Sequence, residues 1–140
     1  MADLPPVDDR TMRTTYERVL ARCPDRLAQT DADGSVTFAD SYARSLRLAA
    51  GFAAAGMARQ EPVALMLDNS LEQVHAFTGL ALGGMVEVPV NTAYKGQFLA
   101  HILNDSGATV AVAEDGYLDR LAAISGELTS LRTSLQGLHT

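Results

Sequence analysis

The chain has 140 residues, 47% of them hydrophobic and 20% charged, which is the composition of one globular domain or of part of a larger one. Its formal net charge of -6 and its single lysine, Lys95, exclude the clustered cations that a nucleic-acid surface needs. A single cysteine, Cys23, excludes an intrachain disulfide. The acidic, proline-containing start is unlike a signal peptide, and no apolar run is long enough for a transmembrane segment, so we expect a cytoplasmic protein.

The N-terminal part of the sequence predicts a helix and a hairpin behind a flexible arm at residues 1–10. Thr11 is suited to cap a helix that continues to about Arg22, where a Cys-Pro pair follows and disfavours helical backbone. Residues 26–30 and 35–37 are two short strand-like runs on either side of a turn, which predicts a small hairpin.

Strand-like and helix-like segments alternate through the rest of the chain. Three aliphatic or β-branched runs, at 63–67, 85–90 and 109–113, are separated by segments of helical period. Right-handed crossovers make such strands parallel neighbours or near neighbours. We therefore predict an α/β fold: a partial parallel sheet with helices on both faces, preceded by a helix and a small hairpin. The expected helices span residues 37–55, 70–82, 95–106 and about 117–128, and residues 129–140 are expected to form an irregular tail.

Helical periodicity also predicts which side chains of these helices face the core. The expected inward residues are Tyr42, Leu46, Ala49 and Ala53 in the first of the four helices, Leu71, Val74, Phe77 and Ala81 in the second, and Phe98, Leu99, Ile102 and Leu103 in the third.

Three glycine-containing motifs have some likeness to ligand-binding loops, but each fits a structural role better. The run from Asp31 to Gly34 begins like a calcium loop and lacks its later acidic ligands, so we predict a hairpin turn. Gly83-Gly84 ends a predicted helix, and Lys95-Gly96 has the reverse order of a phosphate-binding Gly-Lys pair. We expect helix boundaries at both places.

The histidines and the cysteine show no pattern of a metal or catalytic site. His75, His101 and His139 are isolated, and no two of them have the spacing of four residues that places metal ligands on one helix face. For His75 and His101 we expect packing or a surface role. Cys23 is expected to be a small buried apolar group.

Polar residues follow the first two predicted strands of the parallel sheet. Asp68-Asn69-Ser70 comes after the first strand, and Asn91-Thr92-Ala93 comes after the second. Because ligands of open parallel sheets bind beyond the carboxyl ends of the strands, these loops are the best candidates for ligand contact. The alternative is that Asn69 and Ser70 cap a helix and that Asn91 stabilises a turn, and we favour this alternative.

Several of these segments, in this order, resemble the N-terminal part of the adenylate-forming superfamily, which includes acyl-CoA synthetases, luciferases and peptide-synthetase adenylation domains. The sequence from Asn91 to Gly96 is most similar to that of carboxylate-CoA ligases. The segments that carry the resemblance are Arg22–Arg26, Val36–Asp40, Ala55-Gly56, Glu61–Ser70, Gly79–Gly84, Val88–Thr92 and His101–Ala108.

The resemblance implies an incomplete N-terminal AMP-binding-type domain over residues 11–128. In the complete family enzymes, ATP activates a carboxylic acid with the help of Mg²⁺, and CoA then accepts the acyl group. The sequence contains no Ser/Thr/Gly-rich phosphate loop, and Lys95 does not take the position of the catalytic lysine. We therefore assign no catalytic, cofactor-binding or metal residue and expect a fragment that is inactive alone. The family would enter another apolar strand after residue 133, whereas this sequence reads Ser134–Thr140 and stops. This departure suggests an early stop, a frameshift or an artificially chosen end.

Two other hypotheses remain open. A truncated parallel sheet would leave an unpaired edge, so the chain could be a non-catalytic α/β binding or assembly module that self-associates or pairs with a separate chain. A self-sufficient small enzyme would need a nucleophile with its base or a perturbed carboxylate in a cleft. The sequence offers no such arrangement, and this hypothesis ranks last.

Overall fold

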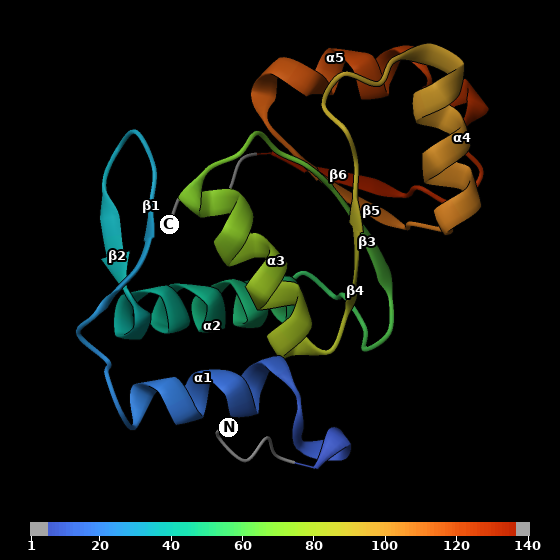
Figure 1. The fold of residues 1–140 in the computed structure, drawn as a ribbon. Helices are drawn as coiled ribbons and strands as arrows, with labels where there is room; N and C mark the ends of the chain where they lie inside the picture. Colours follow the sequence, from blue (N-terminus) through green and yellow to red (C-terminus); the bar gives the residue numbers. More distant parts are fainter. Residues whose placement is uncertain (1–5, 137–140) are drawn as a thin grey trace.

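The computed structural model, which describes residues 6–136, places one helix and a hairpin beside a parallel sheet (Figure 1). The N-terminal elements are the 3-10 helix η1 (Val7–Asp9), the helix α1 (Met12–Leu20), the strands β1 (Leu27–Thr30) and β2 (Ser35–Thr37), and the helix α2 (Phe38–Ala54). The strands β1 and β2 pair antiparallel, so the predicted hairpin is confirmed.

The four strands of the second sheet are all parallel, in the order β4-β3-β5-β6. The strand β3 leads through α3 to its neighbour β4, and β4 leads through α4 across β3 to β5. The predicted α/β fold with a parallel sheet is therefore confirmed. The elements of this part are β3 (Pro62–Met66), α3 (Leu71–Gly83), β4 (Val86–Pro89), α4 (Gly96–Ser106), β5 (Val110–Ala113), α5 (Asp115–Ala123), η2 (Ser125–Glu127) and β6 (Thr133–Gln136).

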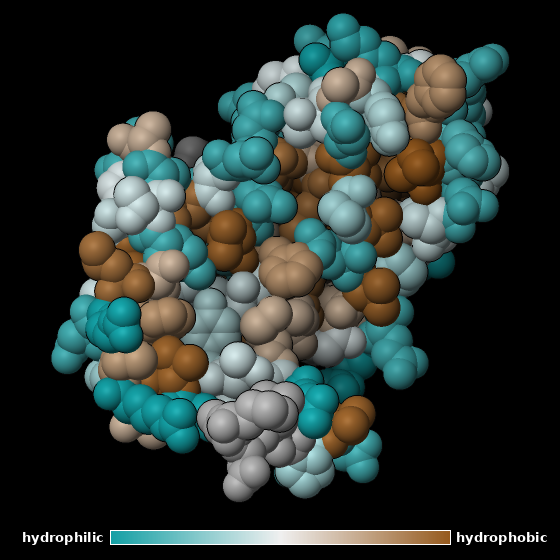
Figure 2. Space-filling view, in the orientation of Figure 1, coloured by the Kyte–Doolittle hydropathy of each residue, from teal (hydrophilic) through white to brown (hydrophobic). Residues whose placement is uncertain are grey.

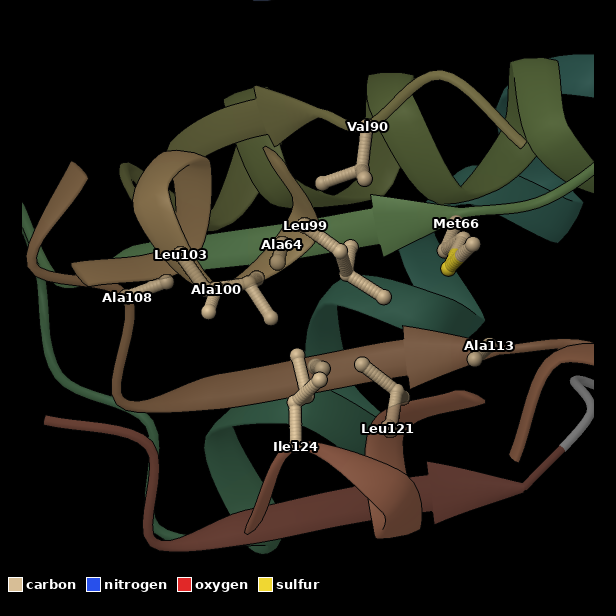
Figure 3. Close-up of a cluster of buried hydrophobic side chains, with 11 residues drawn as sticks. Ala64, Met66, Val90, Leu99, Ala100, Leu103, Ala108, Ala113, Leu121 and Ile124 are labelled. Carbon is tan, nitrogen blue, oxygen red and sulfur yellow. The ribbon is translucent and has the colours of Figure 1, made fainter. Parts of the chain in front are cut away.

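Helices cover both faces of this sheet, α2 and α3 on one face and α4 and α5 on the other (Figure 1). Successive residues of a strand point to opposite faces, so alternate residues of β3 and β5 belong to different cores. Val63, Leu65 and Val112 pack with Phe52 of α2 and Leu80 of α3. On the other face, a second core packs against α4 and α5 (Figure 3); it contains Ala64, Met66, Ala111 and Ala113 of the strands with Leu99, Leu103, Leu121 and Ile124.

The helix starts follow the predicted capping residues. The hydroxyl oxygens of Thr11, Thr37 and Ser70 each accept a backbone N–H from the third residue that follows. At the other end of α3, Gly84 adopts the left-handed conformation with φ 76°, which a residue with a Cβ rarely adopts. The sequence therefore marked these boundaries correctly.

The helices α2 and α3 approach closely because small residues line their interface. Ser41 and Ser45 of α2 are fully buried. A Cβ placed on Gly79 of α3 would lie 3.0 Å from the backbone oxygen of Ser45 and 3.0 Å from the Cβ of Leu48. His75, one turn before Gly79, lies in the same interface and is fully buried.

Several predicted inward residues are exposed instead. Phe77 of α3 is 39% exposed and Phe98 of α4 is 77% exposed. The helix α3 is apolar on nearly every side, so its periodicity does not define one face. In α2 the buried residues are Ser41, Ser45, Ala49 and Phe52. The predicted inward face was therefore correct at Ala49, and the observed face is rotated about the helix axis relative to the rest of the prediction.

The predictions for the two ends of the chain are partly wrong. Residues 133–136 form β6 beside β5, where an irregular tail was expected, and Val7–Asp9 form a turn of 3-10 helix within the expected arm. The Thr-Ser-Leu-Gln sequence of β6 lacks an apolar run, but a strand at a sheet edge needs only one neighbour. Residues 1–5 and 137–140 lie outside the described residues.

The strand β4 forms one edge of the sheet. The backbone N–H groups of Val86 and Val90 donate to carbonyls on the β3 side, so the alternate residues Glu87 and Pro89 direct their backbone groups outward. Proline has no N–H, which leaves Glu87 as the outward donor of this strand. The edge is therefore poorly suited to adding another strand.

Candidate functional site

A cleft of about 500 Å³ opens at the carboxyl ends of β3 and β4. It lies where the chain leaves β3 toward one face of the sheet and leaves β4 toward the other, and this divergence is the usual position of ligand sites in open parallel sheets. Both loops proposed from the sequence contribute to it. The lining residues are Leu65, Leu67, Asp68, Asn69, Gln73, Pro89, Val90, Asn91 and Thr92.

The polar residues of the two loops also have local structural roles. The Ser70 hydroxyl accepts the N–H of Gln73 at 3.1 Å and caps α3. The side-chain oxygen of Asn91 accepts the N–H of Ala93 at 2.8 Å and closes a turn. The capping and turn roles that we favoured for Ser70 and Asn91 are thus confirmed, and Asn69 and Thr92 line the cleft beside them.

The loop after β3, which contains Asp68, forms one wall of the cleft. Two residues at the start of α5 hydrogen-bond Asp68 and hold this wall. The Tyr117 hydroxyl donates to Oδ1 of Asp68 at 2.7 Å, and the Asp68 N–H donates to Oε1 of Glu114 at 2.7 Å. The hydrogen bond to the Asp68 carboxylate raises the pKa of Tyr117, because loss of the phenolic proton would break it. Asp68 is thereby fixed through both its side chain and its backbone.

The same helix also holds the wall that follows β4. The guanidinium of Arg120 donates to the backbone carbonyl of Thr92. It also lies over the ring of Tyr117, with its central carbon 4.8 Å from the ring centroid. Tyr117 and Arg120 are one helical turn apart, so α5 contacts both walls of the cleft. Neither residue was identified as part of the cleft from the sequence.

The chemistry of the lining favours hydrogen bonding over group transfer. The described lining residues supply one carboxylate, three amides and one hydroxyl, and none of them is Lys, Arg, His, Ser or Cys. Asp68 and the nearby Glu114 oppose the approach of a phosphate, since like charges repel. The cleft can hold a polar ligand group, but the described lining has no nucleophile–base pair.

The three glycine-containing motifs have the structural roles that were predicted. Oδ1 of Asp31 accepts the N–H groups of Asp33 and Gly34 at 2.9 and 3.0 Å, which makes a tight turn. The other carboxylate oxygen accepts the N–H of Leu71, and these bonds lower the pKa of Asp31. Gly84 ends α3, and Lys95 precedes the first residue of α4.

His75, His101 and Cys23 take the separate positions that the structure gives them, and none is part of a metal site among the described residues. His75 is fully buried, and its two ring nitrogens have no hydrogen-bond partner, so burial lowers its pKa. His101 is exposed on α4, and Cys23 is free and half-buried rather than buried as predicted. His139 lies outside the described residues. Over residues 6–136, no group of three His, Cys, Asp or Glu side chains could hold a metal ion.

The layered parallel sheet and its cleft define an open α/β protein of the kind that binds ligands at strand ends. The model of the AMP-binding enzyme family matches residues 16–138, so the chain belongs to this family of adenylate-forming enzymes. Its fold corresponds to part of the N-terminal domain of those enzymes, as the sequence resemblance indicated.

Curated and solved relatives include CoA ligases and a tyrocidine synthase. Tyrocidine synthase 3 of Brevibacillus parabrevis is 30% identical over 120 residues, which cover 86% of this chain. A long-chain-fatty-acid CoA ligase from Rhodopseudomonas palustris has a TM-score of 0.84 at 28% identity over 95% of this chain. An anthranilate CoA ligase in complex with anthranoyl-AMP has a TM-score of 0.85 at 25% identity over 97% of this chain.

The chain matches a small part of each relative. It spans 2% of the tyrocidine synthase, 34% of the R. palustris ligase chain and 26% of the anthranilate ligase chain. No helix in the described part of the chain has the length and apolar character needed to cross a membrane.

Proposed function

We propose that this chain is the N-terminal segment of a cytoplasmic ATP-dependent carboxylate-CoA ligase. In this reaction a carboxylate oxygen attacks the α-phosphate of ATP, an acyl-adenylate forms, and pyrophosphate leaves. The thiol of CoA, losing its proton, then attacks the acyl carbon, and AMP leaves. ATP, Mg²⁺ and CoA would be the cofactors and co-substrates of the complete enzyme.

The observation that carries this proposal is the match to two CoA ligases over nearly the whole chain. One of them holds an acyl-adenylate, anthranoyl-AMP, which is the intermediate of the proposed reaction. The cleft between the loops at Asp68 and Asn91 supports the proposal, because it lies at the edge of the sheet where such folds bind ligands.

We further propose that the isolated chain is inactive. Phosphoryl and adenylyl transfer require fixed donors or a metal ion to stabilise charge on the phosphate oxygens. The sequence has no Ser/Thr/Gly-rich phosphate loop, and the cleft lining contains no cation. Those groups would have to come from polypeptide beyond this segment.

Exchange of labelled pyrophosphate into ATP tests the inactivity directly. The purified 140-residue chain, assayed with short- and long-chain carboxylic acids and Mg²⁺, should give no exchange above a no-enzyme control. Clear exchange would contradict the proposed incompleteness. The coding DNA downstream provides the second arm: an in-frame phosphate-loop sequence supports the ligase origin, and its absence from the locus contradicts it.

A peptide-synthetase adenylation segment is the second candidate, because tyrocidine synthase 3 is 30% identical. The two candidates share the adenylation step and differ in the thiol that accepts the acyl group. An assay of the complete gene product with CoA and, separately, with a phosphopantetheinylated carrier protein distinguishes them. Acyl-CoA formation supports the ligase, whereas loading of the carrier alone supports the synthetase.

A non-catalytic assembly module is favoured by a different observation. Phe77 of α3 is 39% exposed, and apolar residues gather over this helix (Figure 2). A partner chain that covers α3 would bury this surface. Gel filtration and binding of a hydrophobic dye test the idea. A monomer that binds no dye would exclude a need for such a partner.

A further inference from the structure

The two walls of the cleft are both attached to α5, although they belong to different loops. Asp68 in the wall after β3 accepts a hydrogen bond from Tyr117. Thr92 in the wall after β4 accepts one from Arg120. The Arg120 guanidinium lies 4.8 Å from the centroid of the Tyr117 ring, so the two attachments contact each other.

We propose that α5 sets the position of the two walls relative to each other, with Tyr117 and Arg120 as positioning residues of the cleft. A ligand that contacts one wall would then meet the other wall already in place. The proposal rests on the proposed function, because the cleft is the candidate site of that enzyme. It concerns this chain's own residues and needs no bound nucleotide for its test.

The geometry explains why the two attachments should act together. A guanidinium is planar and rigid, so the group that donates to Thr92 cannot shift without also moving over the Tyr117 ring. The Tyr117 hydroxyl in turn orients the Asp68 carboxylate, while Glu114 at the start of α5 accepts the N–H of the same residue. Displacement of one wall should therefore be transmitted through α5 to the other.

Each wall contains a backbone amide that reports on its order. The Asp68 N–H is bonded to Glu114, and the Ala93 N–H is bonded to the side chain of Asn91. Exchange of these two hydrogens with solvent can be followed residue by residue by NMR. The amide of Val112 in the fully buried β5 core serves as the internal reference.

The decisive variant is Arg120→Met, which keeps an unbranched apolar side chain and removes the guanidinium. Arg120 donates to Thr92 and makes no hydrogen bond to the Asp68 loop in the described structure, so a local effect would be confined to Thr92 and Ala93. We expect exchange at both Asp68 and Ala93 to accelerate at least threefold, with Val112 unchanged. The variant Tyr117→Leu should accelerate exchange at both amides directly, because the Tyr117 side chain interacts with Thr92 as well as with Asp68.

The matched control is Arg18→Met, an exposed arginine of α1 that is not among the residues lining the cleft; it should leave both amides unchanged. Acceleration at Ala93 alone in Arg120→Met would overturn the coupling. Equal acceleration at Val112 would show a general loss of stability and would also overturn it. Because no nucleotide or acid is present, these outcomes are independent of the pyrophosphate-exchange result that tests the proposed function.

Discussion

Acidification should destabilise this protein through His75. Its side chain is fully buried between α2 and α3, and neither ring nitrogen has a hydrogen-bond partner. Burial is the largest cause of its lowered pKa; Arg44 and Arg47 of α2 lower it further, whereas Glu72 and Asp31 act in the opposite direction. The folded protein therefore resists protonation of a group that titrates freely after unfolding.

The sign and size of the pH effect on stability follow from the difference between the pKa of His75 in the folded and in the unfolded chain. The ordinary pKa of the side chain is 6.5, and the folded value lies below it, so the unfolded chain binds more protons as the pH falls. Stability is fully present above pH 6.5 and is lost as the pH falls toward the folded pKa. If the ring stays neutral in the folded state, the loss between about pH 7.5 and about pH 5.5 is about 1.4 kcal/mol, which is the upper limit for one group.

Urea denaturation followed by circular dichroism at the two pH values measures this loss. The variant His75→Leu removes the titrating group and should show a smaller difference between the two pH values. His101→Leu is the matched control, because this histidine is exposed on α4 and its replacement should leave the wild-type difference in place. An identical pH dependence in His75→Leu and the wild type would refute the reasoning.

The comparison between variants is needed because carboxyl groups also contribute. Burial raises the pKa of Glu87, so its protonation favours the folded state and partly offsets the effect of His75. Hydrogen bonds lower the pKa values of Asp31 and Glu61 below 3.8 and 4.5, and their contribution is lost only at more acidic pH. The difference between wild type and His75→Leu isolates the histidine.

Two further pairs of variants test the packing. Gly79→Ala should lower the free energy of unfolding by about 1–3 kcal/mol, because the added Cβ meets α2 at 3.0 Å. Gly51→Ala should raise the free energy of unfolding by about 0.5–1 kcal/mol, because an added Cβ there meets nothing within 4 Å. Urea denaturation measures both variants, and equal effects would contradict the close approach of α2 and α3. Leu99→Ala should cost about 2–5 kcal/mol because the side chain is fully buried, whereas Phe98→Ala, at 77% exposure, should change stability by about 0.5 kcal/mol or less. A larger loss at Phe98 than at Leu99 would show that α4 is rotated relative to the structure described.

Features determined by local chemistry could be predicted from the sequence. Thr11, Thr37 and Ser70 were identified as caps because a hydroxyl oxygen satisfies an N–H that the helix itself leaves free. The strands β3 and β5 were identified by continuous aliphatic runs, since both of their faces are buried. Each of these signals lies within a few residues of the element that it predicts.

Features determined by packing could not be predicted in the same way. The buried face of α2 includes Ser41 and Ser45, because small side chains allow α3 to approach, and a search for apolar periodicity overlooks them. The exposure of Phe77 was missed for the opposite reason, because α3 offers apolar residues on both sides. The strand β6 was missed because its stability depends on pairing with β5.

The cleft combines features that could be predicted from the sequence with features that could not. Its loops were predictable because parallel strands bring their carboxyl ends to one edge, whatever their separation in sequence. Its attachments to α5 were not, since Tyr117 lies 49 residues from Asp68 and Arg120 lies 28 residues from Thr92. Tyr117 and Arg120 meet these partners only because β5 lies next to β3, which places the start of α5 beside the loop that follows β3. The topology of the sheet therefore determines both where the cleft opens and which helix can hold its two walls together.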